Sequence, residues 1–125
     1  MIYQCLTFNI TDKRKAILSY YNSISLAFTE LEARSYGGGV LEILPGELER
    51  VTIPNLEDIH IDDEILNNLL EELDDLVRND NDITPVLNLL DQRILEEILN
   101  IPRETINTFH SIWLTLRNRR LNRGL

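Results

Sequence analysis

The sequence predicts an α+β domain, in which a long N-terminal helix and a short strand pair precede a small cluster of three helices. Three patterns support this class. Apolar residues recur at helical spacing in the first part of the chain, at Ile17, Tyr21, Ile24, Phe28 and Leu31. Short runs of apolar and β-branched residues at 2–10, 40–44 and 51–54 are typical of extended segments. Leucine-rich helical stripes return after Pro54.

The first half is expected to begin with a strand within 2–10. Thr11 and Asp12 are suited to cap the helix that follows, which is predicted over 13–33. Three consecutive glycines end this helix, and the run 40–44 forms the next strand. Residues 51–54 are predicted to be extended, because the residue before a proline is disfavoured in a helix.

The second half is predicted to be helical. Apolar residues from Ile65 to Val77 line one face of a helix whose acidic start suits the positive end of the helix dipole. Thr84 and Pro85 are a good cap and first-turn pair for the next apolar stripe, which covers 86–98. A break at 100–102 precedes the last helix. Its inward residues are predicted to be Ile106, Phe109, Ile112, Trp113 and Leu116.

Length and composition limit the domain organisation and the class of protein. With 125 residues, of which 43% are hydrophobic, the chain suits one compact domain. Within it we expect an α+β segment at 1–54 and a helical segment at 55–125. No apolar run has the roughly 20 residues that a membrane span needs. A single cysteine excludes an internal disulfide and favours an intracellular, cytoplasmic setting.

Charge is distributed unevenly along the chain, which has a formal net charge of -9. Acidic residues crowd the middle, and basic residues gather near the two ends. The basic groups are Lys13, Arg14 and Lys15 near the start, and Arg117, Arg119, Arg120 and Arg123 near the finish. The net charge argues against tight autonomous binding of DNA, because duplex affinity depends on cations that neutralise phosphates.

No catalytic site is predicted. The glycine triplet is followed by Val40 and Leu41 rather than by Lys and Ser or Thr, so it is not a phosphate-binding P-loop. A zinc site from Cys5, His60, His110 and a carboxylate is conceivable, but separate structural roles for these residues are the better explanation. We therefore predict no metal and no cofactor for this chain.

The glycine segment, defined here as residues 34–39, is the strongest candidate for a contact site. It consists of Arg34, Ser35, Tyr36, Gly37, Gly38 and Gly39. Glycine lets another molecule approach the main chain closely, and three in a row cost conformational entropy that a core seldom requires. A tight turn between helix and strand is the other interpretation, and both stay open.

The order and spacing of several residues resemble the C-terminal region of an N6-adenine DNA methyltransferase. These residues are Asn22-Ser23, Glu30-Leu31, the glycine segment with Val40-Leu41, and Pro45. Enzymes of that group belong to restriction–modification systems and place a target-recognition region after a catalytic domain. Ala33 stands where those enzymes often have glycine. The tail 112–121, with its tryptophan and arginines, is also similar to the ending of such enzymes.

The resemblance implies a part of the target-recognition region that binds double-stranded DNA within the parent enzyme, next to a catalytic domain or subunit. The catalytic tetrapeptide Asn/Asp-Pro-Pro-Tyr/Phe and the S-adenosylmethionine loop of the family are absent from this sequence. We therefore expect no methylation by this chain alone, and S-adenosylmethionine to bind elsewhere in the full-length enzyme.

Predicted DNA contacts are the glycine segment together with Arg117, Arg119 and Arg120. Main-chain N–H groups of the glycines would approach phosphates, and Tyr36 would stack on or wedge against a base. The arginines would touch phosphate, or else only complement the C-terminal end of a helix. Asn22 and Ser23 are expected to lie inside a helix and to make a buried hydrogen bond to a neighbouring loop rather than to contact DNA.

Two other functions compete with this one. The chain would be an acidic helical module for protein–protein interaction if its Leu-rich faces at 65–77 and 86–98 dock a partner and no DNA is bound. An enzyme of an unrecognised type is the third alternative.

Overall fold

Helices dominate the computed structural model, which describes residues 2–4, 12–32, 34–35, 41–42, 52–79 and 82–123. The helical elements are α1 (Lys13–Tyr20), α2 (Ser23–Glu32), α4 (Asp63–Asn79), α5 (Thr84–Leu90), the π-helical η2 (Asp91–Ile98) and α6 (Arg103–Arg123). The strands are β1 (Ile2–Gln4), β2 (Arg34–Ser35), β3 (Leu41–Glu42) and β4 (Thr52–Pro54), each of two or three residues.

The α+β prediction is wrong, because the strands of the described residues form only two isolated antiparallel pairs. β1 pairs with β4, with Tyr3 opposite Ile53, and β2 pairs with β3, with Ser35 opposite Leu41. Two-stranded pairs this short offer no sheet face on which a core can be built. The helices supply that core instead, so the architecture is a helical assembly with small strand pairs at its edge.

The predicted long helix over 13–33 is two helices, and Asn22 explains the break. Its Nδ2 donates to the carbonyl oxygen of Ser19 at 2.6 Å, and its Oδ1 accepts from the backbone N–H of Ser25 at 3.0 Å. One side chain therefore satisfies a free carbonyl near the end of α1 and a free N–H at the start of α2. The start of α1 is as predicted, since Asp12 accepts a hydrogen bond from the N–H of Arg14.

We expect the Asn22→Ala variant to lower the free energy of unfolding by about 1–2 kcal/mol, because it removes the N-terminal cap of α2 in a fully buried position. Denaturation with urea measures this loss. Asn88→Ala is the matched control, because Asn88 lies exposed on α5 and alanine has the higher helix propensity. Equal stability of the two variants would contradict the capping role.

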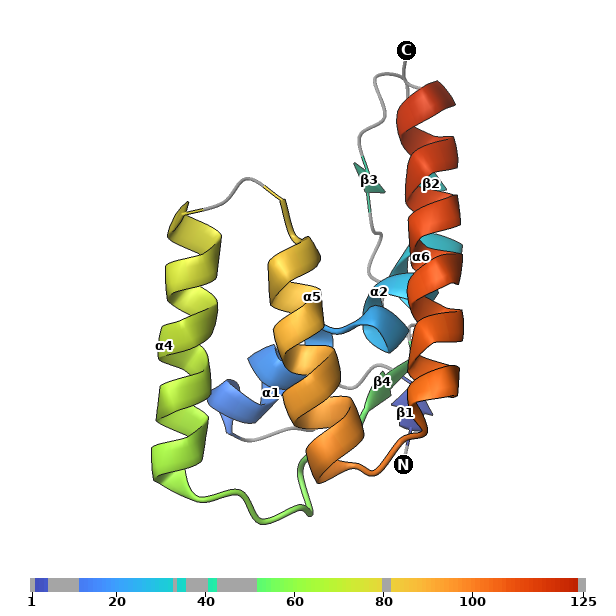
Figure 1. Ribbon diagram of the computed structural model, residues 1–125. Coiled ribbons are helices and arrows are strands. Elements are labelled where there is room, and N and C mark those ends of the chain that lie inside the picture. Colours follow the sequence, from blue (N-terminus) through green and yellow to red (C-terminus); the bar gives the residue numbers. More distant parts are fainter. Residues whose placement is uncertain are drawn as a thin grey trace.

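Figure 1 shows α4, then α5 continued by η2, then α6 standing roughly side by side, with α1 and α2 crossing them. The main core lies between these helices, and residues of every helical element contribute to it. Its buried members are Leu18, Ile24, Leu56, Ile61, Leu66, Leu69, Val86, Leu90, Ile94, Leu95 and Ile106. On β4, Ile53 packs against Ala16, Tyr20 and Phe28 and so joins the strand pair to α1 and α2.

The helices predicted in the second half are confirmed, with two refinements. The ends of the predicted stripe on α4 face solvent, since Ile65 is 38% and Val77 53% exposed. The stripe over 86–98 consists of α5 followed directly by η2, so the helix changes from α-helical to the wider π-helical form at Asp91. Asn100 then takes a left-handed conformation, with φ of 56°, and Pro102 precedes α6. None of the described helices has the length and apolar character that crossing a membrane demands.

Candidate nucleic-acid interface

The first turn of α2 is held by a buried carboxylate. Ser23 donates its backbone N–H to Oδ1 of Asp91 at 2.8 Å, and its hydroxyl donates to Oδ2 of the same side chain. Nδ1 of His110 lies 3.0 Å from the Ser23 hydroxyl oxygen. Because the single hydroxyl hydrogen is already donated to Asp91, the Ser23 oxygen accepts a hydrogen bond from Nδ1–H of His110. One node thus joins α2, η2 and α6.

This Ser–Asp–His node is not a nucleophilic triad, although it contains the three residue types. In a triad the histidine takes the serine proton and the carboxylate orients the other ring nitrogen. Here the carboxylate binds the serine itself, and its oxygen lies 4.0 Å from Nδ1 of His110, the nitrogen that also faces the serine. Ser23 is fully buried, so no substrate reaches its hydroxyl. The arrangement suits a structural anchor.

Burial shifts the pKa of Asp91, which is only 2% exposed. Desolvation raises the pKa of its carboxyl group above the ordinary value. The hydrogen bonds from Ser23, and to a smaller degree the charges of His110 and Arg103, lower this pKa.

The buried hydrogen bond that was expected for Ser23 is present, but its partner is Asp91 on the helix η2 and not a loop. Sequence reasoning did not single out Asp91 among the many acidic residues.

The other end of α2 is held by an ion pair with α6. The carboxylate of Glu30 accepts hydrogen bonds from two groups of Arg120, Nη2 at 2.8 Å and Nε at 3.1 Å. The side chains are only 6% and 14% exposed. A fork of this kind fixes both distance and orientation. It brings the C-terminal part of α6 against the last turn of α2, two residues before the described stretch Arg34–Ser35 begins.

The remaining arginines of α6 have different surroundings. The guanidinium of Arg117 lies over the ring of Trp113, 5.6 Å from its centroid. Its charge also contributes to the lowered pKa of Asp82, after the larger effect of the hydrogen bonds from Thr84. Arg119 is exposed, and among the described residues it makes no hydrogen bond or ion pair. Of the three predicted contacts on α6, Arg119 is therefore the most accessible cation.

The glycine segment is described only at its start. The backbone of Arg34 and Ser35 forms β2 and pairs with β3, while Tyr36, Gly37, Gly38 and Gly39 lie outside the described residues. Its role as a contact site stays a prediction. The structure places its first two residues directly after α2, whose two ends are held by Asp91 and Arg120.

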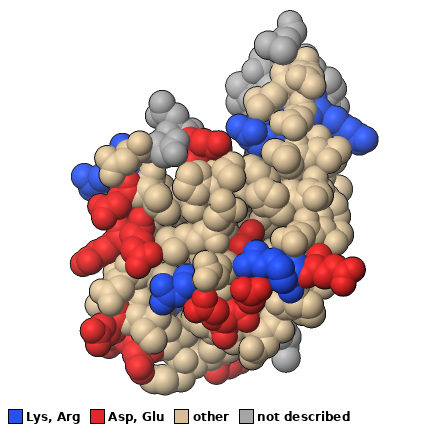
Figure 2. All heavy atoms as spheres, in the orientation of Figure 1, with Lys and Arg blue, Asp and Glu red and all other residues tan. Residues whose placement is uncertain are grey.

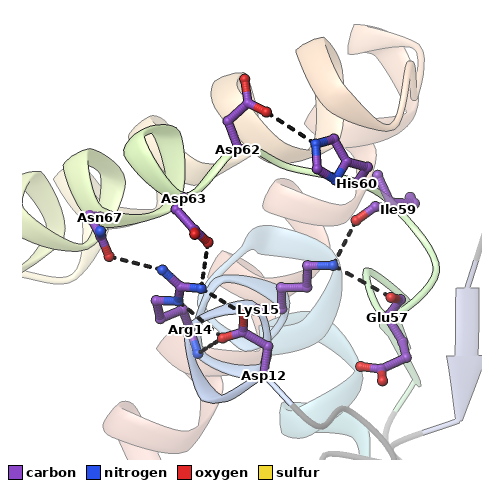
Figure 3. A network of polar contacts seen from close by, with 9 residues as sticks. All are labelled: Asp12, Arg14, Lys15, Glu57, Ile59, His60, Asp62, Asp63 and Asn67. Carbon is purple, nitrogen blue, oxygen red and sulfur yellow. Dashed lines mark hydrogen bonds and ion pairs between the residues drawn. The ribbon is translucent and has the colours of Figure 1, made fainter.

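Two of the three basic residues near the start of the chain, Arg14 and Lys15, bind neighbouring elements, while Lys13 is exposed. Arg14 binds Asp12 and, across to α4, Asp63 at 2.9 Å and Asn67 at 3.1 Å, as Figure 3 shows. These carboxylates raise the pKa of Arg14, with Asp12 the larger influence. Lys15 donates to the carbonyl oxygen of Ile59 at 2.7 Å. These two cations fasten α1 to the chain around α4.

No metal centre is found in the part of the chain that the structure describes, where no three His, Cys, Asp or Glu side chains converge. His60 is exposed and contacts Asp62 at 3.1 Å, while His110 belongs to the buried node. Cys5 lies outside the described residues.

The charge on the face drawn in Figure 2 is uneven. Acidic groups gather on the side formed by α4, acidic and basic groups mix across the lower part, and basic groups lie over the upper part of α6, called here the α6 pole. The exposed acids of α4 are Asp63, Glu64, Glu71, Glu72, Asp74 and Asp75. A polyanion meets less repulsion at the α6 pole than the net charge suggests.

Comparison with known proteins identifies the family. Residues 1–95, out of 125, match the family described as Type II methyltransferase M.Eco57I, C-terminal domain. The match includes α2 and the glycine segment and ends within η2, so α6 and the similar tail 112–121 lie beyond it. No curated protein and no solved structure matches the chain. The resemblance to a restriction–modification methyltransferase is thereby confirmed, and the chain belongs to the family of the C-terminal domain of Type II methyltransferase M.Eco57I.

Proposed function

We propose that this domain contributes to DNA binding and target recognition by an N6-adenine DNA methyltransferase. The glycine segment and Arg119 would form its contact surface. The chemistry would lie in a catalytic domain or subunit that binds S-adenosylmethionine and the target adenine. Family membership supports a place in a methyltransferase, and the residues of the glycine segment support the adenine-specific group.

The observation that carries the proposal is the Glu30–Arg120 ion pair. It joins residues 90 positions apart and sets the C-terminal part of α6 beside the helix that leads into the glycine segment. The ion pair thus brings α2, the helix that precedes the glycine segment, against the part of α6 that carries the arginines. Arg119 lies two residues after Arg117 and directly before Arg120, and it is exposed with no polar partner in the part of the chain that the structure describes.

The charge distribution favours the same orientation. DNA at the α6 pole would lie away from the acidic face of α4, which would point to solvent, to the catalytic domain or to a protein partner. Because Arg34 and Arg119 would neutralise few phosphates, the catalytic part is expected to supply most of the positive surface.

Within this surface we assign two kinds of contact. Arg34, Arg119 and the main-chain N–H groups of Gly37, Gly38 and Gly39 would bind phosphates and fix the register of the protein on the duplex. Tyr36 would stack on a base, which would help an enzyme that must extrude its target adenine from the helix.

We expect Tyr36→Ala to raise the Kd for duplex DNA by about tenfold, the equivalent of about 1.4 kcal/mol of lost stacking. Arg34→Ala should reduce the dependence of log Kd on log salt by about one unit, because one phosphate contact is lost. Mobility shifts at several salt concentrations measure both effects, with this chain and its catalytic part assembled. Methylation by the same preparations should fall in parallel.

Lys13→Ala is the control, because Lys13 is an exposed cation on α1 and carries the same charge as the tested arginine. It should leave affinity and salt dependence unchanged. If Tyr36→Ala and Arg34→Ala also behave like the unsubstituted protein in DNA binding and methylation, the contact surface is refuted. Protein–protein interaction through the acidic helices would then be the better function.

A further inference from the structure

Two neighbouring arginines of α6 differ in what surrounds them. Arg120 is 14% exposed and meets Glu30 through a two-point contact, whereas Arg119 is exposed and has no polar partner among the described residues. Consecutive residues of a helix point about 100° apart, so one faces α2 while the other faces outward. Sequence alone allows a phosphate contact, or a role at the C-terminal end of the helix, for both.

We propose that Arg120 is a positioning residue and not a phosphate contact. Through Glu30 it fixes the last turn of α2, and with it the place of Arg34 and Ser35, the described residues at which the glycine segment begins. This inference rests on the proposed function, because it says how the contact surface is held in place.

The contacts at the two ends of α2 support this role. The first turn is bound through Ser23 to the buried carboxylate of Asp91, and the last turn through Glu30 to Arg120. Between them, Ala27 packs with Leu87 of α5 and Trp113 of α6 in a second cluster of the core. A helix held in the middle and at both ends has little freedom to tilt, so the backbone that follows Glu32 starts from a defined place.

Arg120 is also poorly suited to bind phosphate in this arrangement. Glu30 already accepts from its Nε and Nη2. Leaving this carboxylate for a phosphate would strand a charge that is only 6% exposed. Removing one partner of a buried pair is costly because the other is left uncompensated. Phosphate contact is more favourable for Arg119, which would break no polar contact with the residues that the structure describes.

The two roles predict opposite results for a conservative substitution. Lysine keeps the charge that a phosphate needs, but it cannot form the two-point contact with a carboxylate. In the enzyme assembled with its catalytic part, Arg120→Lys should raise the Kd for labelled random-sequence duplex DNA by about tenfold, comparable to one lost charge-assisted hydrogen bond. The salt dependence of log Kd should stay that of the unsubstituted protein.

The matched variants are at the neighbouring position. Arg119→Ala should lower the salt dependence by about one unit, and Arg119→Lys should retain it. Thermal unfolding of each preparation accompanies the binding data, so that a loss of folded protein is separated from a loss of affinity.

Exchange of the charges provides the decisive test. In the double variant Glu30→Arg and Arg120→Glu the pair can form with reversed polarity, so affinity should recover relative to either single variant. A phosphate-contacting Arg120 would give the reverse result, because the new carboxylate would repel DNA.

The positioning role is overturned if Arg120→Lys binds as tightly as the unsubstituted protein, or if Arg120→Ala lowers the salt dependence by about one unit while Arg119→Ala does not. If Arg119→Ala lowers the salt dependence but all Arg120 variants bind normally, positioning fails and the proposed function stands. If Arg34→Ala, Tyr36→Ala and Arg119→Ala all leave DNA binding unchanged, the proposed function fails, and positioning fails with it.

Discussion

Asp91→Ala is expected to destabilise the domain by about 3 kcal/mol. The substitution leaves the N–H and the hydroxyl of Ser23 without an acceptor in a fully buried place, and each such group costs about 1–3 kcal/mol. Relief from burying a carboxylate offsets part of this loss. Urea denaturation followed by the fluorescence of Trp113, the single tryptophan, measures the change.

Asp91→Asn is the matched control for the same site. Its amide oxygen can accept from the N–H of Ser23, and its shape is retained, so the expected loss at neutral pH is below about 1 kcal/mol. If the alanine and asparagine variants are equally unstable, the hydrogen bonds to Ser23 are not the reason for the loss.

The same pair of proteins reports on the pKa of Asp91. Burial raises this pKa in the folded state, so folded protein binds a proton that the unfolded chain does not bind between the two pKa values. The contribution of Asp91 to stability therefore rises as the pH falls through the folded pKa toward the ordinary value. The stability of the unsubstituted protein relative to Asp91→Asn should increase on acidification from neutral pH to about pH 4. A constant difference would contradict the raised pKa.

Trp113→Ala is expected to cost about 3–5 kcal/mol, the usual range for removing a buried tryptophan. Trp113 is 3% exposed and packs with Ala27 and Leu87, where α2, α5 and α6 meet. The variant also loses the ring contact with His110 and the cation–π contact with Arg117. Far-UV circular dichroism during urea denaturation measures the loss.

Leu114→Ala serves as the neighbouring control, because Leu114 is 39% exposed on the same helix. Its substitution should cost less than about 1 kcal/mol. Comparable losses at positions 113 and 114 would mean that α6 is packed in a different rotation.

Local pattern was sufficient to predict the helices of the second half. α4 and α6 carry apolar residues at helical spacing, and Asn100 with Pro102 marks a boundary through the chemistry of single residues. The prediction for the first half missed the break at Asn22 and the pairing of the strands. Apolar spacing continues across Asn22, so periodicity does not indicate that this residue caps a helix. The pairing of short strands depends on partners that periodicity does not identify.

The candidate interface was predictable in its residue types but not in their roles. Nothing local separates Arg119 from Arg120, since the distinction comes from Glu30, 90 residues earlier. Asp91 likewise gains its meaning from Ser23, 68 residues away. Such pairings depend on how helices are placed against one another, which the sequence of a single helix does not encode.

These long separations have a consequence for the order in which the domain acquires its shape. Contacts that close long loops cost entropy before they give any stabilisation, and they slow folding. During synthesis, α2 emerges long before Asp91 and Arg120 do, so it at first lacks the two side chains that later bind its ends. Both ends of α2 are therefore held only after α6 has been synthesised.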